Sequence, residues 1–267
     1  MSSPRLDTRS RDFTWRPSHP PYRLISADQA AAYDRDGYFL FENAFTAAEM
    51  DFVSDAVAPF EEATEAFLRR RKGGRMLIAK ADAITFTIHL VTKSQVLRQF
   101  SLHPVFQGLC HDTLGPDARL YWDQAVYKKP GNPEEFPWHQ DNGYTFVEPQ
   151  QYLTCWVALN DATLDNGCPW VVPGLHRAGT LEHSYTELGW QCLEMPSDAI
   201  AVPAKKGDIV VFSSLTPHRT GPNLTNGVRR AYILQYAPDG ARAYPRDRQD
   251  AVPQDDPDRQ YRMVNVL

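Results

Sequence analysis

The chain has 267 residues, of which 42% are hydrophobic, and this length and composition favour one large domain with a sizeable core. Its formal net charge of -5 offers no basic surface for nucleic acid, and no apolar run reaches the ~18 residues that a membrane-spanning helix requires. Four cysteines lie far apart, with no Cys-x-x-Cys pair, so a reducing compartment fits better than a disulfide-stapled secreted domain. We therefore expect a cytoplasmic protein.

The first 22 residues are rich in Arg, Ser and Pro, and they lack the apolar stretch of a secretory signal. We predict that residues 1–22 form a loose N-terminal arm. Residues 23–267 are predicted to form a single domain, because no repeat or low-complexity run interrupts them. Within this domain, residues 238–262 are polar and rich in Pro, Asp and Arg, so an irregular segment is expected there.

Capping boxes predict two helices in the first third of the chain. In this motif a hydroxyl side chain and a Glu or Gln three residues later bond to each other's backbone amides. Ser26 with Gln29 predicts a short helix, and Thr46 with Glu49 predicts a longer one that runs toward Arg71. A further helical stretch is expected over residues 93–114. The helices therefore come mostly before the strands.

Short strands separated by Gly, Pro, Asn and Asp clusters fill most of the remaining chain. In residues 152–160 two sets of side chains alternate, so one face is expected to pack outward and the other to line a barrel interior. About seven or eight strands suit a sandwich or a barrel. The predicted strands are residues 38–41, 76–79, 84–90, 119–129, 152–160, 169–172, 209–212 and 228–236.

A candidate metal motif stands at His139-Gln140-Asp141. A histidine and a carboxylate two residues apart on extended backbone project to the same face, where both can bind one metal ion. Such a pair arises often by chance, so a third ligand is needed. Of the eight histidines, His218 is the best candidate, because it follows a buried-looking strand and precedes two further polar side chains. His176, in a Pro-Gly turn, is the competing candidate.

Two imidazoles and one carboxylate form the ligand set that binds one face of Fe(II) and leaves three positions open for a bidentate co-substrate and dioxygen. A dicarboxylate co-substrate also needs a cation at its far end. Arg229 begins the last predicted strand, and the planar guanidinium fork suits a carboxylate. The hydroxyl of Thr220 can donate one more hydrogen bond. This set predicts iron together with 2-oxoglutarate.

These residues occur in a wider pattern that resembles the phytanoyl-CoA dioxygenase family of Fe(II)/2-oxoglutarate oxygenases. The resemblance begins at Asp36-Gly37-Tyr38 and continues to the last strand near Tyr236, so it covers most of the chain. Its other motifs, specific in their order and spacing, are Pro137-Trp138-His139-Gln140-Asp141, residues 166–177 around Pro173-Gly174-Leu175-His176, and His218-Arg219-Thr220-Gly221-Pro222-Asn223 with Arg229.

The resemblance implies a mainly β fold with flanking helices, a double-stranded β-helix (jelly-roll, cupin-like) barrel with the helices packed on one side. It also implies the cofactors Fe(II), 2-oxoglutarate and O2. The residues that it implicates are His139, Asp141 and His218 as iron ligands, Arg229 and Thr220 at the distal carboxylate of 2-oxoglutarate, and Gln124 and Trp156 facing the co-substrate. The neighbouring Arg230 is expected to point to the opposite face of its strand.

Three further residues are candidates for contact with the substrate. Asn142 and Tyr144 follow the metal motif directly, and Lys128 should share a strand face with Gln124. The competing interpretation is a solvated loop and a lysine whose ammonium reaches the solvent.

The function implied by the resemblance is hydroxylation of a C–H bond of a small molecule, with release of succinate and CO2. Related halogenases have a small residue in place of the acidic ligand, so Asp141 favours hydroxylation over halogenation. A cupin-like metal-dependent isomerase or a non-catalytic small-molecule binding protein is the alternative, and such a protein would have no use for Arg229. Neither nucleic acid nor a membrane is an expected partner, and the oligomeric state is open.

Overall fold

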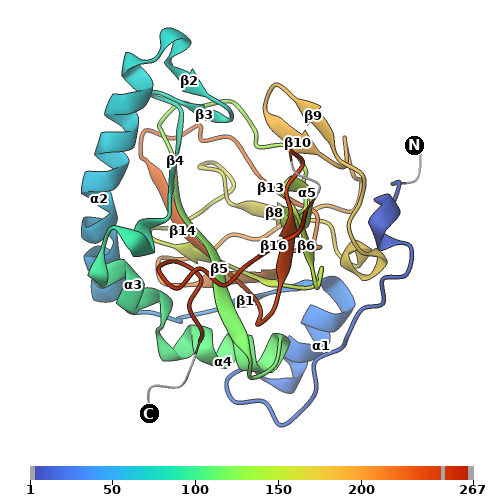
Figure 1. Ribbon diagram of the computed structural model, residues 1–267. Helices are drawn as coiled ribbons and strands as arrows, with labels where there is room; N and C mark the ends of the chain where they lie inside the picture. Colours follow the sequence, from blue (N-terminus) through green and yellow to red (C-terminus); the bar gives the residue numbers. More distant parts are fainter. Residues whose placement is uncertain (1–3, 248–249, 264–267) are drawn as a thin grey trace.

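The computed structural model describes residues 4–247 and 250–263, which form a barrel of antiparallel strands with helices against one side (Figure 1). The main sheet has eight strands in the order β1-β12-β7-β14-β5-β4-β3-β2. A three-stranded sheet, β11-β8-β13, shares the barrel interior with it, since side chains of both pack in one cluster. This arrangement is the double-stranded β-helix that the sequence predicted, and the prediction is confirmed.

The elements are short and numerous. The helices are α1 (Ala27–Asp36), α2 (Ala47–Arg70), α3 (Gln95–Ser101), α4 (Pro104–Thr113) and α5 (Asp141–Tyr144), with 3-10 turns at Thr8–Ser10, Lys72–Gly74, Leu90–Thr92 and Leu175–Ala178. The strands are β1 (Tyr38–Phe41), β2 (Arg75–Met76), β3 (Ala79–Lys80), β4 (Ile84–Ile88), β5 (Ala118–Lys128), β6 (Phe146–Glu148), β7 (Leu153–Ala158), β8 (Pro169–Val171), β9 (Ser184–Thr186), β10 (Gly189–Gln191), β11 (Ile200–Ala201), β12 (Ile209–Ser213), β13 (His218–Thr220), β14 (Arg229–Pro238), β15 (Arg242–Tyr244) and β16 (Val252–Pro253).

The main sheet separates two apolar clusters. Its outer face packs against the helices, where Val57 of α2 and Phe106 of α4 are fully buried. Its inner face contributes Trp156, Phe212 and Ile233 to a second cluster inside the barrel. Strand β7 is buried on both faces, with alternate side chains in the cluster beneath the helices and in the cluster inside the barrel. Because the barrel interior is closed off by the two sheets, polar groups placed there are shielded from water.

Both capping boxes are present as predicted, at Ser26 for α1 and at Thr46 for α2. The helical stretch predicted over residues 93–114 contains two helices, α3 and α4. His103 has extended backbone, with φ -56° and ψ 142°, and the following Pro104 occupies the first turn of α4. A proline disfavours helical backbone at the preceding residue, which explains the break.

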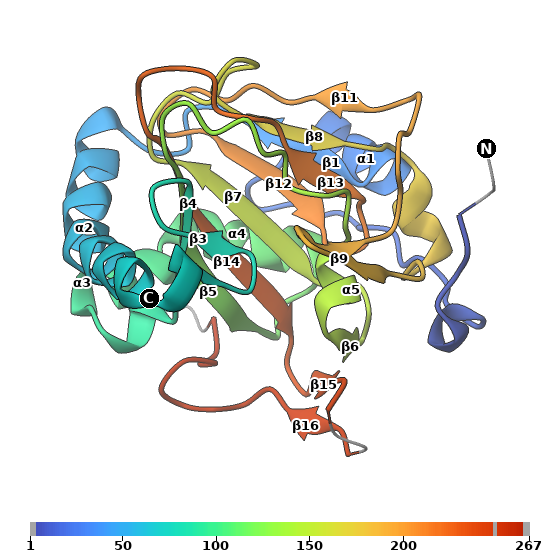
Figure 2. The same cartoon turned by 90° about the horizontal axis from the view of Figure 1, so that it is seen from above.

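Residues 76–79, predicted as one strand, form the turn of a hairpin between β2 and β3, with Leu77 at φ 52°. The C-terminal segment predicted to be irregular is largely so, but it also contributes β15 and β16. These two strands extend a small sheet with β6 at the rim of the barrel (Figure 2).

The N-terminal residues that the structure describes differ from the predicted loose arm. Trp15 is 7% exposed, and its indole donates a hydrogen bond to Asp34 at 3.1 Å. The backbone amide of Asp7 donates to the carbonyl of Thr180 at 2.9 Å. The apolar and polar contacts of this segment involve residues far along the chain, which local sequence patterns do not reveal. Across the described residues, no helix has both the length and the apolarity to cross a membrane.

Candidate metal centre and co-substrate pocket

The three predicted iron ligands converge inside the barrel. His139 precedes α5, Asp141 is the first residue of α5, and His218 begins β13. One ligand atom from each lies within 4.8 Å of the other two. The Oδ1 atom of Asp141 is 3.9 Å from Nε2 of His139 and 3.7 Å from Nε2 of His218. These are the donor atoms of a two-histidine, one-carboxylate site, a set that suits Fe(II).

Backbone pairing brings the two histidines together. His139 and His218 form an isolated β-bridge, with reciprocal hydrogen bonds of 3.0 and 2.8 Å. Each ring also has its Nδ1 atom near a backbone carbonyl. Nδ1 of His139 is 2.8 Å from the carbonyl oxygen of Pro137, and Nδ1 of His218 is 3.0 Å from that of Thr216. A carbonyl accepts a proton from Nδ1, so the lone pair of each histidine lies on Nε2, the atom that faces Asp141. Burial, with a contribution from His218, lowers the pKa of His139, which favours the neutral form that binds a metal.

The carboxylate ligand is oriented by β7. Thr154 donates a hydrogen bond from Oγ1 to Oδ2 of Asp141 at 2.6 Å, so Oδ1 is left for the metal. The side chain of Thr154 is on the same face of β7 as that of Trp156.

We expect Thr154→Val to weaken the affinity for a divalent metal by roughly 10–100-fold, as is typical when a partner that orients a ligand is removed. Valine matches the shape of threonine but cannot donate to Asp141. Metal titration followed by calorimetry measures the effect. Unchanged affinity would show that the Thr154 hydroxyl has no part in orienting the carboxylate.

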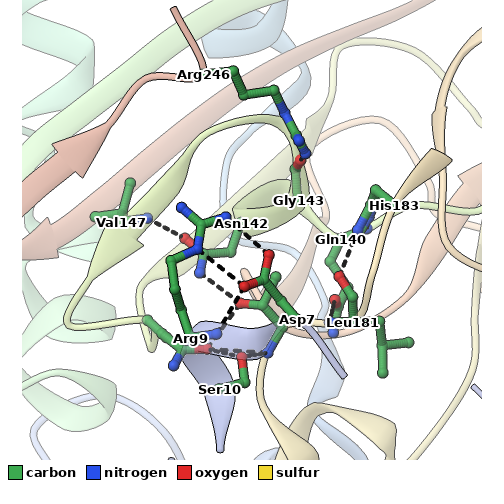
Figure 3. A network of polar contacts seen from close by, with 12 residues as sticks. Asp7, Arg9, Ser10, Gln140, Asn142, Gly143, Val147, Leu181, His183 and Arg246 are labelled. Carbon is green, nitrogen blue, oxygen red and sulfur yellow. Dashed lines mark hydrogen bonds and ion pairs between the residues drawn. The ribbon is translucent and has the colours of Figure 1, made fainter. Parts of the chain in front are cut away.

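A polar network fixes the loop that carries the motif (Figure 3). The Gln140 side chain is buried and donates to the carbonyls of Gly179 and Leu215 at 3.0 and 2.6 Å. The Asn142 amide donates to Thr180 at 2.7 Å and accepts from the amide of Val147 at 2.8 Å. Asn142, a predicted substrate contact, therefore has its carboxamide engaged within the protein. Its interactions hold the loop that follows the metal motif.

Arg229 is fully buried, and its guanidinium is largely unpaired. Its Nη1 atom donates to the carbonyl of Val126 at 3.4 Å, whereas Nε and Nη2 have no hydrogen-bond partner among the described residues. The guanidinium carbon lies 5.3 Å from the centre of the Trp156 ring. Burial lowers the pKa of Arg229 to about 10, so the side chain stays charged at neutral pH. A buried cation without a counter-ion is costly, and an anionic ligand would remove that cost.

The other predicted site residues lie on the same inner surface with different surroundings. Thr220 Oγ1 is 3.5 Å from the ammonium of Lys128, a residue that is itself 1% exposed. The interpretation of Lys128 as a solvent-reaching lysine is therefore wrong. Gln124 accepts a hydrogen bond from the indole of Trp122 at 3.3 Å. The ring of Tyr144 lies edge-on to His139, with 5.2 Å between the ring centres.

Tyr121 packs in the barrel against a cluster that includes Tyr152 and Ala237, a position that the sequence patterns did not reveal. Between β14 and β5, Gln235 pairs with Trp122 and Tyr236 pairs with Leu120, so Tyr121 is the extra residue of a β-bulge. The Tyr121 ring packs on that of Tyr152, with 5.2 Å between the ring centres. Burial, and next the negative charge of Asp141, raise the pKa of the Tyr121 hydroxyl. Strict alternation along β5 would have placed Tyr121 on the outer face. The bulge reverses the alternation locally, so the side chain lies on the inner face.

His176 is not part of the metal site. Its ring is fully buried and lies edge-on to Trp15, with 4.4 Å between the ring centres. A Cβ atom added to Gly37 would lie 2.6 Å from Nδ1 of His176, so the imidazole packs directly against this glycine. His176 therefore fills the contact between the N-terminal segment and the end of α1.

Comparison with known proteins agrees with this geometry. The sequence profile described as phytanoyl-CoA dioxygenase (PhyH) matches residues 33–231. A probable phytanoyl-CoA dioxygenase of Caenorhabditis elegans is 28% identical over 242 residues, which cover 81% of this chain and 76% of that protein. An ectoine dioxygenase of Bordetella bronchiseptica is 26% identical over 236 residues, 79% of this chain and 75% of that one.

Among solved structures, the epimerase SnoN in complex with Fe3+, alpha ketoglutarate and nogalamycin RO has a similar fold. Its TM-score is 0.68 at 21% identity, and the match covers 88% of this chain and 97% of that one. The family profile matches well over half of the chain, and the matched range includes all three predicted ligands and Arg229. The chain belongs to the phytanoyl-CoA dioxygenase (PhyH) family.

Proposed function

We propose that the protein is an Fe(II)- and 2-oxoglutarate-dependent dioxygenase that hydroxylates a C–H bond of a small-molecule substrate and releases succinate and CO2. The observation that carries this proposal is the buried guanidinium of Arg229, which has two nitrogens without partners among the described residues and lies in the same barrel as the two-histidine, one-carboxylate group. The metal ligands and a free cation for a distal carboxylate are the two halves of a 2-oxoglutarate site.

Each residue has a distinct part in this function. His139, Asp141 and His218 hold the iron, and the proton on each histidine Nδ1 keeps Nε2 available as a ligand. The bound iron, with 2-oxoglutarate and O2, supplies the oxidising chemistry. Arg229 forms the ion pair with the distal carboxylate and fixes the orientation of the co-substrate, while Thr220 donates a hydrogen bond. The closed apolar interior around Trp156 excludes water from the ion pair, which strengthens it.

The substrate is proposed to contact the aromatic side of the metal site. Tyr144 is the residue proposed to make this contact, since its ring lies edge-on to His139. Gln124 and Trp156 are proposed to face the co-substrate. Asp141, held by Thr154, supports hydroxylation over halogenation. We also propose that the enzyme acts in the cytoplasm, consistent with four free cysteines.

An isomerase or a plain binding protein built on the same barrel would gain nothing from an unpaired buried arginine. Charge burial costs several kcal/mol per ion as an order of magnitude, so such a protein would be more stable with an apolar residue at position 229.

Anaerobic titration tests the proposal. Addition of Fe(II) and then 2-oxoglutarate to the protein should produce a weak visible absorption band near ~500 nm, as expected for iron chelated by a 2-oxo acid. Under air, 2-oxoglutarate should be converted slowly to succinate even without the prime substrate. A screen of small metabolites for faster succinate release would then identify the substrate. The absence of the band with the iron-loaded protein would overturn the proposal.

A further inference from the structure

Lys128 is a second buried cation beside Arg229. The two residues are paired across β5 and β14, and Lys128 is 1% exposed. Its ammonium donates to the carbonyl of Gly221 at 2.6 Å, to the carbonyl of Glu134 at 3.2 Å and to Oγ1 of Thr220 at 3.5 Å. No carboxylate side chain forms an ion pair with Lys128 among the described residues, although Lys129 and Lys206 of the same chain do form such pairs.

The three acceptors belong to the two segments that carry the metal histidines. Glu134 lies in the loop that leads to His139, and Thr220 and Gly221 are two and three residues after His218. One ammonium therefore joins both segments to the end of β5. Because Thr220 Oγ1 is an acceptor for Lys128, the proton of that hydroxyl is free to be donated to another group.

Charged groups of both signs surround this ammonium, and Arg219 among them is ion-paired with Glu135. The charged groups that face it are Arg229 on β14, Arg219 on β13, and Glu134 and Glu135 in the loop before His139. Burial, and next the charge of Arg229, lower the pKa of Lys128 to about 7, so the two acidic residues do not offset these effects. A dianionic ligand would stabilise the protonated form of Lys128 and would be attracted by it.

We propose that Lys128 is a positioning residue of the 2-oxoglutarate pocket, which directs the Thr220 hydroxyl toward the distal carboxylate and adds a second positive charge beside Arg229. This inference rests on the proposed function. It assigns Lys128 to the co-substrate, where the sequence had suggested the substrate.

Two ligands distinguish this role from a purely structural one. 2-Oxoglutarate has the distal carboxylate, whereas 2-oxovalerate has the same carbon chain with a methyl group in its place. Both chelate the metal through the same end. With Mn(II) in place of iron, neither ligand is turned over, so calorimetry measures binding alone. The variants are Lys128→Met and, as the matched control, Lys129→Met, which alters the adjacent outward lysine that pairs with Glu61 at 2.5 Å.

We expect Lys128→Met to weaken 2-oxoglutarate binding by roughly 10–100-fold and 2-oxovalerate binding by no more than about 3-fold. Lys129→Met should leave both affinities within about 2-fold. Equal weakening of both ligands by Lys128→Met would overturn the proposal and indicate that Lys128 only supports the metal segments. Unchanged binding of both ligands would overturn it as well.

The wild-type protein provides a second test that does not depend on the folding of a variant. Lys128 is protonated below its pKa of about 7, and bound 2-oxoglutarate should raise that pKa. The affinity for 2-oxoglutarate relative to 2-oxovalerate should therefore fall as the pH rises above about 7, by up to roughly tenfold per unit. Arg229, with a pKa of about 10, stays charged over this range. A ratio that is independent of pH would overturn the proposal.

The two proposals fail in different ways. If the wild-type protein with Mn(II) binds neither ligand, the proposed function fails. If it binds 2-oxoglutarate more tightly than 2-oxovalerate but Lys128→Met does not change that preference, only the role of Lys128 fails.

Discussion

The His218→Ala protein is expected to lose Fe(II) binding and 2-oxoglutarate decarboxylation together. His218 supplies one of three ligand atoms and forms the backbone bridge to His139, but the bridge does not depend on the side chain. Removal of the imidazole therefore leaves the segment in place with only two ligands, too few to hold Fe(II) in this site. Anaerobic metal titration, the visible band and succinate release are the three measurements.

His176→Ala is the matched control. His176 is buried between Trp15 and the end of α1, so its loss should lower the free energy of unfolding by about 1–3 kcal/mol through the cavity that it leaves. Iron binding by the folded protein should be retained. The opposite result, with iron binding retained in His218→Ala and abolished in His176→Ala, would mean that the ligand set is assigned wrongly.

The second large effect is expected at Arg229. Arg229→Met should reduce the binding free energy of 2-oxoglutarate by roughly 2–4 kcal/mol, which is about 30- to 700-fold in affinity, because the distal carboxylate would be buried without a cation. The same change should stabilise the protein without ligands by about 1–3 kcal/mol, because a buried charge with unpaired nitrogens is replaced by an apolar side chain. Calorimetry and denaturant unfolding measure the two effects.

Arg230→Met is the control for this experiment. Arg230 is exposed on the outer face of β14, with its guanidinium carbon 5.7 Å from the centre of the Tyr127 ring. We expect 2-oxoglutarate affinity to be unchanged and stability to change by less than about 0.5 kcal/mol. If Arg229→Met loses stability and leaves 2-oxoglutarate affinity unchanged, Arg229 is a structural residue and the co-substrate site lies elsewhere.

Strand alternation explains why Arg229 could be distinguished from Arg230 before the fold was known. Successive side chains of a strand point to opposite faces, and the apolar residues of β14 set which face is inside. The same rule placed Lys128 on the inner face with Gln124. It failed at Tyr121, because a β-bulge adds one residue to β5 and locally reverses the alternation.

Local sequence patterns did not predict the boundary between α3 and α4 or the burial of Trp15. A single proline sets the first, and contacts with other segments of the chain set the second. The region 93–114 has a continuous helical pattern, yet Pro104 starts a new helix. The N-terminal residues have no apolar periodicity, but Trp15 is buried against Tyr33 of α1. These contacts join residues far apart in the chain.

The chemistry of the site could be predicted from residue types and their order along the chain. The types and order of His139, Asp141, His218 and Arg229 were enough to predict an iron site with a dicarboxylate co-substrate, because metal and carboxylate recognition depend on side-chain identity. The neighbours that orient and charge those residues became visible only in the folded barrel. Strand pairing across the barrel places Thr154 against Asp141 and Lys128 beside Arg229. Pairing between distant strands is set by the packing of the whole domain, so local sequence patterns do not reveal these contacts.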